Sequence, residues 1–443
     1  KERKRRGKFK SEQLRKETCM TRTTGACIRC QKNKIRCIPG PDPAGWCMNC
    51  LALSSRVVRM PCFRARVTEA ELFRRGPTSE FSCTRRWILL TSVKEIDTWS
   101  SPTPRIIEIT QDMGPTLQLF CKEYTPLDGD RQDYHWKDAF TGATKTLTTP
   151  PYAIADVERA YSTIEQYIEE NLVMYLEGIL DSENTIVWES FRIAMSMAGS
   201  DGSAMIRRAL KLWVGSRLIE EPWRVCGNDT LGMNVCLDMG SPYYGRIPVT
   251  PIMDFQLDNI TIHYLLMPWK SRILKELQKK ILGNRKEDWL EVHLTMFILL
   301  NNVERQIKHD NWFARRYSLT HRFSNYQLID AIFNGAKILL AHFHHVNKGH
   351  MPFSLTWEGN YVNMNASRLP THSLSSDQVK YMQQVTRAAK AQEYKLRQLQ
   401  ELKMYEAPMF WCSQLFLPGW APPSSPSPQE PYTMSGMSTA IAV

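Results

Sequence analysis

The sequence lacks a long run of apolar residues. Its longest run, at 294–300, is interrupted by Thr295 and is far shorter than the roughly 20 residues that span a bilayer. The N-terminus is a charge run without the apolar centre of a secretory signal peptide. We therefore expect an intracellular protein without a transmembrane helix, in a compartment where disulfides are rare. Because the chain begins at Lys1 rather than Met, it is compatible with a piece of a longer protein.

The sequence also lacks the common signatures of catalysis. It has no Gly-rich phosphate loop, no G-x-S-x-G and no H-E-x-x-H, and its carboxylates show no recognisable pairing. One histidine group has no acidic or cysteine ligand close by, so we expect a partly exposed helix end rather than a metal site. This group is His342, His344, His345 and His350. We expect no enzyme, no catalytic residue and no bound organic cofactor.

Acidic residues are scarce at the N-terminal end. Of the 57 Lys and Arg and 45 Asp and Glu in the chain, residues 1–66 hold 18 basic and only 4 acidic ones. This end therefore has a net charge of +14 and the remainder one of −2, so the whole positive excess of the chain, +12, comes from this end. Such a concentration of positive charge predicts a polyanionic partner, and nucleic acid is the obvious one.

Six cysteines in this basic end follow a repeated spacing. Two C-x-x-C pairs each have a further cysteine downstream, after six residues in the first half and after eleven in the second. Dense thiolates suit zinc, but six are too few for two separate four-coordinate ions. If two cysteines bridge, six sulfurs give each of two ions four ligands. The expected ligands are Cys27, Cys30, Cys37, Cys47, Cys50 and Cys62.

Residues 27–62 resemble the fungal binuclear zinc-cluster (Zn2Cys6) DNA-binding domain, whose pattern is C-x2-C-x6-C, a variable loop, C-x2-C and a last cysteine. The resemblance implies that Cys27 and Cys47 bridge two structural zinc ions. The last spacing, of eleven residues, exceeds the usual six to eight, and the nearest replacements for Cys62 are Cys19 and Cys83. The ending P-C-x-R-x-R also resembles a large branch of these fungal regulators.

The resemblance also implies how DNA is read. Each C-x-x-C should begin a short helix, the first carrying residues 31–36 into the major groove and the second, apolar at 51–53, packing behind it. In the family a Lys four residues after the second cysteine reads a base, and Lys34 has that position. A cation there suits the acceptors of guanine and CGG-like triplets, although Asn33 replaces a second Lys. The expected phosphate contacts are Arg29, Lys32 and Arg36.

Other roles for the cysteines are a disulfide knot and a zinc module that contacts protein or RNA in a nuclear scaffold. The first needs an oxidising compartment. The second usually includes His ligands and lacks basic residues between its first cysteines. We therefore favour DNA binding, with the scaffold as the alternative function.

Beyond the cysteines, the pattern predicts a mainly α protein. Short β-type runs occur at 87–91, 105–110 and 117–121, and 122–151 reads as irregular. Apolar residues then recur at helical spacing in many segments from Val157 to about residue 406. No apolar heptads are sustained after the cluster, so the sequence leaves dimerisation open. We expect a disordered basic arm at 1–26, the Zn2Cys6 domain at 27–66, a strand-containing linker at 67–152, an α-helical regulatory domain at 153–418 and a disordered tail at 419–443.

Taken together, these features predict a transcription factor of the nucleus that regulates RNA polymerase II. Its expected partners are double-stranded DNA and transcription co-regulators, and no membrane. The basic run at residues 1–10 suits nuclear import or phosphate contact. Because every zinc position would be filled by a thiolate, we expect the two ions to be structural.

Overall fold

The computed structural model describes most of the chain in two compact units. The described residues are 11–42, 45–53, 62–76, 84, 96–138, 141–199, 202–283, 285–316, 319–347, 374–424 and 426. Unit 1 combines Lys1–Leu72 with Leu274–Val443, and unit 2 is Phe73–Ile273. Among the described residues helices dominate both units, which confirms the mainly α prediction. No described helix is both long enough and apolar enough to cross a membrane.

Unit 2 contains a five-stranded antiparallel sheet in the order β5-β2-β1-β6-β7. Its central strand alternates as a half-buried strand should, with Ile107 and Ile109 buried and Ile106 about half exposed. A separate hairpin joins β3 to β4. The strands are β1 (Arg105–Thr110), β2 (Leu117–Glu123), β3 (Asp133–Lys137), β4 (Thr144–Thr148), β5 (Tyr152–Ile154), β6 (Arg224–Cys226) and β7 (Ile247–Pro248).

The helices of unit 2 begin at polar caps that their sequence supplies. The side chains of Asp156, Ser203 and Thr250 each accept a hydrogen bond from a backbone N–H of the first turn that follows. Phe191 and Trp213 pack edge to face, 5.4 Å apart, in the core. The helices are α4 (Val157–Ile179), α5 (Thr185–Met197), α6 (Ala204–Leu218), α7 (Pro251–Ile260) and the π-helix η3 (Thr261–Leu266). α8 (Met267–Gly283) continues from unit 2 into unit 1.

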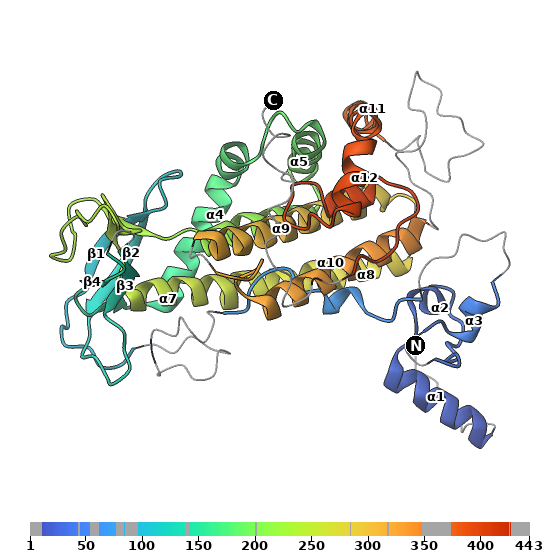
Figure 1. Ribbon diagram of the computed structural model, residues 1–443, viewed down its shortest axis with the longest axis horizontal. Helices are drawn as coiled ribbons and strands as arrows, with labels where there is room; N and C mark the ends of the chain where they lie inside the picture. The colour runs from blue at the N-terminus through green and yellow to red at the C-terminus, as the bar shows by residue number, and fades with distance from the viewer. Residues whose placement is uncertain are drawn as a thin grey trace. The chain divides into compact units, whose positions relative to one another are not determined.

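The larger part of unit 1 is built on two long helices, α9 (Trp289–Arg316) and α10 (Tyr326–Asn347), which pack against each other (Figure 1). Both are buried over most of their length. The C-terminal segment returns to this pair, where the rings of Tyr405 and Trp411 pack edge to face on Phe333. The remaining elements here are α11 (Ser376–Ala391), α12 (Glu393–Glu401) and the 3-10 helix η6 (Cys412–Leu415).

The N-terminal part of unit 1 holds the cysteine-rich region. Its elements are α1 (Glu12–Thr24), α2 (Ile28–Lys32), α3 (Met48–Leu51) and the 3-10 helix η1 (Val67–Glu69). The two short helices α2 and α3 each begin directly after the first cysteine of a C-x-x-C pair. This confirms the prediction that each pair begins a helix, although α2 ends at Lys32 and does not include residues 33–36.

Helix α1 corrects the expectation of a disordered arm at 1–26. The Ser11 hydroxyl accepts a hydrogen bond from the N–H of Leu14 and caps the helix. Thr21 Oγ1 donates to the carbonyl of Cys37 at 3.0 Å, and Glu17 forms an ion pair with Arg36. These contacts hold the helix against the cysteine-rich region. The charge run at 1–10 lies outside the described residues.

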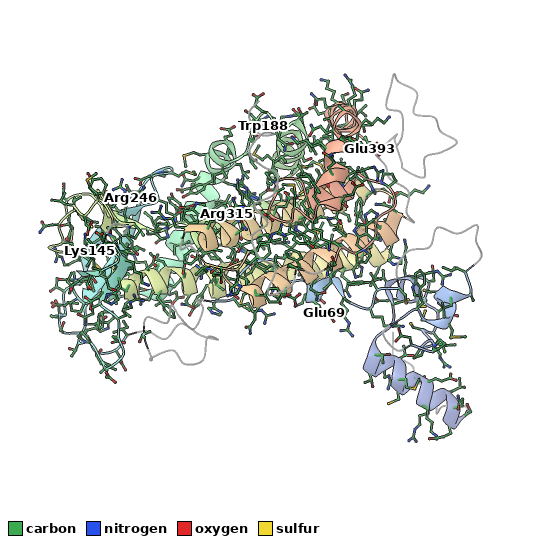
Figure 2. The ribbon with its side chains drawn as sticks, in the orientation of Figure 1. Glu69, Lys145, Trp188, Arg246, Arg315 and Glu393 are labelled. Carbon is green, nitrogen blue, oxygen red and sulfur yellow. The ribbon has the colours of Figure 1, made fainter. Side chains whose placement is uncertain are left out.

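Residues 122–151 are not irregular, as the sequence suggested, because β3 and β4 form a regular hairpin there. Lys145, labelled in Figure 2, forms ion pairs from β4 with Asp138 and Asp238 at 2.5 and 2.8 Å. The expected strands at 105–110 and 117–121 are present as β1 and β2. The one expected at 87–91 lies outside the described residues.

The compact units also divide the chain differently from the expected boundaries. Strand β5 pairs with β2, and the expected linker therefore belongs to the same unit as α4 to α7. The boundary at 152/153 is not a boundary between units. The cysteine-rich region shares a unit with the chain from Leu274 onward. Most of the expected tail, 427–443, lies outside the described residues.

Candidate metal centre and nucleic-acid interface

The two cysteine halves fold as near repeats of each other. In each half the N–H of the first cysteine points at the sulfur of the last, Cys27 N to Cys37 Sγ and Cys47 N to Cys62 Sγ, both at 3.4 Å. The match makes Cys62 the counterpart of Cys37. The longer spacing before Cys62 therefore does not displace it from its place in the repeat.

Two backbone hydrogen bonds join the halves, and they lie at equivalent positions of the repeat. The N–H of Ile28, just after the first cysteine, donates to the carbonyl of Phe63, just after the last one, at 3.0 Å. The N–H of Met48 donates to the carbonyl of Ile38 at 2.9 Å. Each half thus supplies a donor and an acceptor to the other, which brings all six sulfurs to one place.

The sulfurs form two groups of four that share two members. Within each group the Sγ atoms lie within 4.8 Å of one another, and both groups contain Cys27 and Cys47. The groups are Cys27, Cys30, Cys37 and Cys47, and Cys27, Cys47, Cys50 and Cys62. Neither Cys19, which is exposed on α1, nor any histidine belongs to a group among the described residues.

The sulfur separations suit a tetrahedral metal site. Cys27 Sγ lies 3.9 Å from Cys47 Sγ and 3.8 Å from Cys50 Sγ, and Cys30 Sγ lies 3.7 Å from Cys47 Sγ. Four sulfurs about 2.3 Å from a zinc ion at tetrahedral angles would lie about 3.8 Å apart. All the described cysteines are free thiols. The donor set and its spacing therefore fit metal ions such as zinc.

Burial of the cysteines opposes the ionisation of most of their thiols. Burial raises the pKa of Cys27 far above its usual range and that of Cys30 to about 12. At Cys47 burial raises the pKa, but hydrogen bonds, first from the N–H of Cys50, lower it to about 7. Bound metal ions would supply the positive charge that stabilises the remaining thiolates.

Arg64 is a residue of this site that the sequence analysis did not single out. Its guanidinium donates to the carbonyl of Gly45 at 3.0 Å and to the sulfur of Cys37. Burial lowers the pKa of Arg64, but the neighbouring Cys62 and Cys37 sulfurs raise it to a net upward shift. The P-C-x-R-x-R ending was the available signal, since it places this Arg two residues after Cys62.

The four cations expected at DNA have different surroundings. Arg29 Nη1 donates to the carbonyl of Asn49 at 2.9 Å, and Arg36 pairs with Glu17. Lys32 Nζ donates to two carbonyls at the end of α10. Lys34 is exposed just after α2, and of these four cations it alone has no side-chain hydrogen bond or ion pair to any described residue.

The positive φ of Lys34, 54°, places it in a turn that closes α2. Its N–H donates to the carbonyl of Gln31 at 3.1 Å, and the N–H of Ile35 donates to that of Cys30 at 3.0 Å. The turn leaves Asn33, Lys34 and Arg36 exposed. The structure therefore presents Lys34 to solvent from a fixed backbone.

Helix α3 differs from its expected role of packing behind α2. Cys50 is buried, but Met48 and Leu51 are about half exposed. With only four residues, α3 has little surface on which to bury a side chain once the cysteine has turned inward. The apolar composition at 51–53 thus did not predict burial.

The histidine group is structural where the structure describes it. His342 Nε2 donates to the carbonyl of Ala65 at 3.0 Å, and His344 Nε2 donates to that of Gln414 at 2.8 Å. Burial lowers the pKa of each to about 4, so both are neutral near pH 7. They are core residues rather than the partly exposed ones expected, and His350 lies outside the described residues.

Comparison with known proteins places the fold in a family. The profile of the KpeA transcription factor family matches residues 73–415, most of the chain. The chain belongs to this family. The family is one of transcription factors, a class of proteins that are generally not enzymes. The family match begins after the cysteine-rich region, so that region's role depends on the geometry above.

One curated relative extends over most of the chain. The "Satratoxin biosynthesis SC3 cluster transcription factor SAT20" of Stachybotrys chartarum is 24% identical over 417 residues, which cover 90% of this chain. The chain spans about half of that relative's length, since the match covers 56% of it. No solved structure matches the chain.

Proposed function

We propose that the chain is a sequence-specific DNA-binding transcription factor that regulates RNA polymerase II. In this proposal residues 27–66 form a zinc knob, a Zn2Cys6 domain that binds duplex DNA in the major groove. The observation that carries the proposal is the pair of four-sulfur groups sharing Cys27 and Cys47. Membership of a transcription factor family and the basic N-terminal end support it.

The zinc knob would hold two Zn²⁺ ions, with Cys27 and Cys47 bridging them. Six thiolates and two Zn²⁺ ions leave a net charge of about −2, which the nearby Arg64 guanidinium partly offsets. With four thiolates around each ion no open position remains, so the metal is structural. Apart from the cysteines only Ile28 is buried in α2 and α3, so the knob should unfold without metal.

Lys34 would read a base pair. It is exposed, and its ammonium is a donor that suits the O6 and N7 acceptors of guanine, as CGG-like triplets require. Asn33 beside it can pair with adenine and would modify this preference. Arg29, Lys32 and Arg36 would contact phosphates, and each of them also contacts a carbonyl or a carboxylate in this structure.

The proposed place of action is the nucleus. A DNA-binding regulator of RNA polymerase II acts there, and the charge run at 1–10 suits an import signal. The chain from Phe73 onward, which carries the family match, would hold transcription co-regulators. The described residues show no dimer contact, so the proposal includes neither a dimer nor a spacing between DNA half-sites.

The test is selection of bound duplexes from a random pool by the zinc-loaded full chain, followed by affinity measurements. We expect an enriched GC-rich triplet. Lys34→Ala should weaken binding to the selected site by about 10- to 100-fold. Lys395→Ala, which removes an exposed lysine of α12, is the matched control and should change little. Equal affinities of the two variants, or no enriched sequence, would refute readout by Lys34.

A second function has one observation in its favour. The zinc knob exposes Met48 and Leu51 on α3 and Ile35 beside Lys34, each by more than two fifths. Exposed apolar side chains on so small a module suit a protein partner. The zinc-stabilised scaffold is therefore the alternative, and the duplex selection separates the two, since a scaffold would select no sequence.

A further inference from the structure

The zinc knob is held by the C-terminal end of α10. Lys32 Nζ, on α2, donates hydrogen bonds to the backbone carbonyls of His345 and Val346, both at 3.1 Å. The last carbonyls of an α-helix have no donor within the helix and form the negative end of its dipole. The end of α10 therefore offers this ammonium hydrogen-bond acceptors with negative charge, as a phosphate group would.

The chain that follows the zinc knob is held along the same helix. His342 Nε2 donates to the carbonyl of Ala65 at 3.0 Å. Helix η1, on which Figure 2 labels Glu69, packs against α10 with Val67 fully buried. At Gly335 of α10 a side chain would begin 2.0 Å from the carbonyl oxygen of Glu71. The approach is so close that only glycine is accommodated.

These contacts form one docking surface, which we define as Gly335, His342 and the carbonyls of His345 and Val346. It engages a side chain that the proposed function assigns to DNA. Two of the three N–H donors of Lys32 are used by carbonyls, whose partial negative charge also repels phosphate. While Lys32 is docked, its hydrogen bonding and electrostatic attraction to a phosphate are therefore weakened.

We propose that α10 competes with DNA for Lys32, so that this docking surface lowers the DNA affinity of the zinc knob until the contact opens. The proposal rests on the proposed DNA-binding function. Lys34, two residues away and exposed, lies outside the docking surface and stays available for the first encounter with DNA. A signal or partner that moves α10 would thereby change DNA binding.

The docking is tested without DNA by amine labelling of the zinc-loaded full chain and mass spectrometry, with Lys34 as internal reference. Lys32 should react about tenfold more slowly than Lys34, as expected for an ammonium hydrogen-bonded to two carbonyls. Gly335→Leu should displace the segment at Glu71 and raise the rate at Lys32 to nearly that of Lys34. Asn334→Leu, at an exposed position of α10, should not. Equal rates at Lys32 and Lys34 in the wild type would overturn the proposal.

The competition is tested by duplex affinity in a double-mutant cycle. Gly335→Leu should bind DNA about tenfold more tightly than wild type, and Lys32→Ala should cost more affinity in the Gly335→Leu background. Where Gly335→Leu loses helix content by circular dichroism, His342→Phe replaces it, since it keeps the ring and removes the donor. The proposal fails if Gly335→Leu binds DNA more weakly than wild type and Lys32→Ala lowers the affinity equally in both backgrounds. That result would mean that docking only positions the zinc knob. If DNA protects Lys34 from labelling in no variant, the proposed DNA function fails, whatever Lys32 shows.

Discussion

At the scale of single residues, Cys62 shows what sequence spacing could and could not decide. Eleven residues before it left Cys19 and Cys83 as rivals. Among the described residues the geometry favours Cys62 over Cys19, because the N–H of Cys47 points at Cys62 Sγ as that of Cys27 points at Cys37 Sγ. The longer spacing leaves the sulfur of Cys62 among the others. Cys83 lies outside the described residues, and Cys19 lies in neither sulfur group.

Replacing Cys62 should therefore remove part of the metal. Cys62→Ser should lower the zinc content of the purified full chain from about two ions to about one, because the second group loses a thiolate. Cys19→Ser is the matched control and should keep the wild-type content, since Cys19 is exposed on α1. Atomic emission measured against protein concentration gives both values. Loss of zinc in the Cys19 variant alone would reverse the assignment.

His344 predicts a pH effect on stability. Burial lowers its pKa from 6.5 to about 4 in the folded state, whereas the unfolded chain takes up the proton near pH 6.5. Its contribution to stability is therefore complete above pH 6.5 and is lost as the pH falls toward 4. His344→Gln keeps a donor for the carbonyl of Gln414 but does not titrate. Urea unfolding should show that, between pH 6.5 and 4, the free energy of unfolding falls less steeply in the variant than in the wild type. The difference in slope should be about 1.4 kcal/mol per pH unit. An unchanged slope would contradict a neutral buried His344.

At the scale of elements, the helices were predictable and their tertiary supports were not. The apolar spacing predicted α4 to α6 and α8 to α10, because apolar residues recur at helical spacing in each of them, but it did not predict α7. Helix α1 was missed because its support comes from Arg36 and from the carbonyl of Cys37, both beyond its own sequence. The β3–β4 hairpin was missed for a similar reason, since Lys145 meets Asp238, far along the chain.

The C-terminal segment depends on one buried carboxylate in α9. Glu304 accepts hydrogen bonds from the N–H groups of Met409, Trp411 and Cys412 at 2.7 to 3.2 Å. Burial raises its pKa to about 7, against the lowering effect of these donors. It therefore fixes the segment that leads into η6.

Glu304→Gln should destabilise the fold by about 1–3 kcal/mol, because the new NH2 group would face a backbone N–H at the site. Urea unfolding of the full chain, followed by tryptophan fluorescence, measures the loss. Glu393→Gln, at a surface ion pair of α12 labelled in Figure 2, is the control and should change stability by less than about 0.5 kcal/mol. Equal stabilities of the two variants would show that Glu304 does not hold the C-terminal segment.

At the scale of the whole molecule, charge and cysteine spacing predicted the chemistry of the N-terminal end, but not its place in the fold. The sequence suggested a separate domain at 27–66 and a linker after it. In the structure residues 65–72 are part of unit 1, with the carbonyl of Leu72 bound by Asn302 Nδ2 at 2.9 Å. A local sequence pattern cannot predict this contact, because its two residues lie 230 positions apart in the chain.

The central claim is that six cysteines hold two zinc ions by sharing two sulfurs. X-ray absorption at the zinc edge of the zinc-loaded full chain, with the metal content of the same sample, tests it most directly. Two ions per chain, each with four sulfurs at about 2.3 Å, can be built from six cysteines only if two of them bridge. A single ion per chain, or about three sulfurs per ion with nitrogen or oxygen completing the shell, would contradict the account.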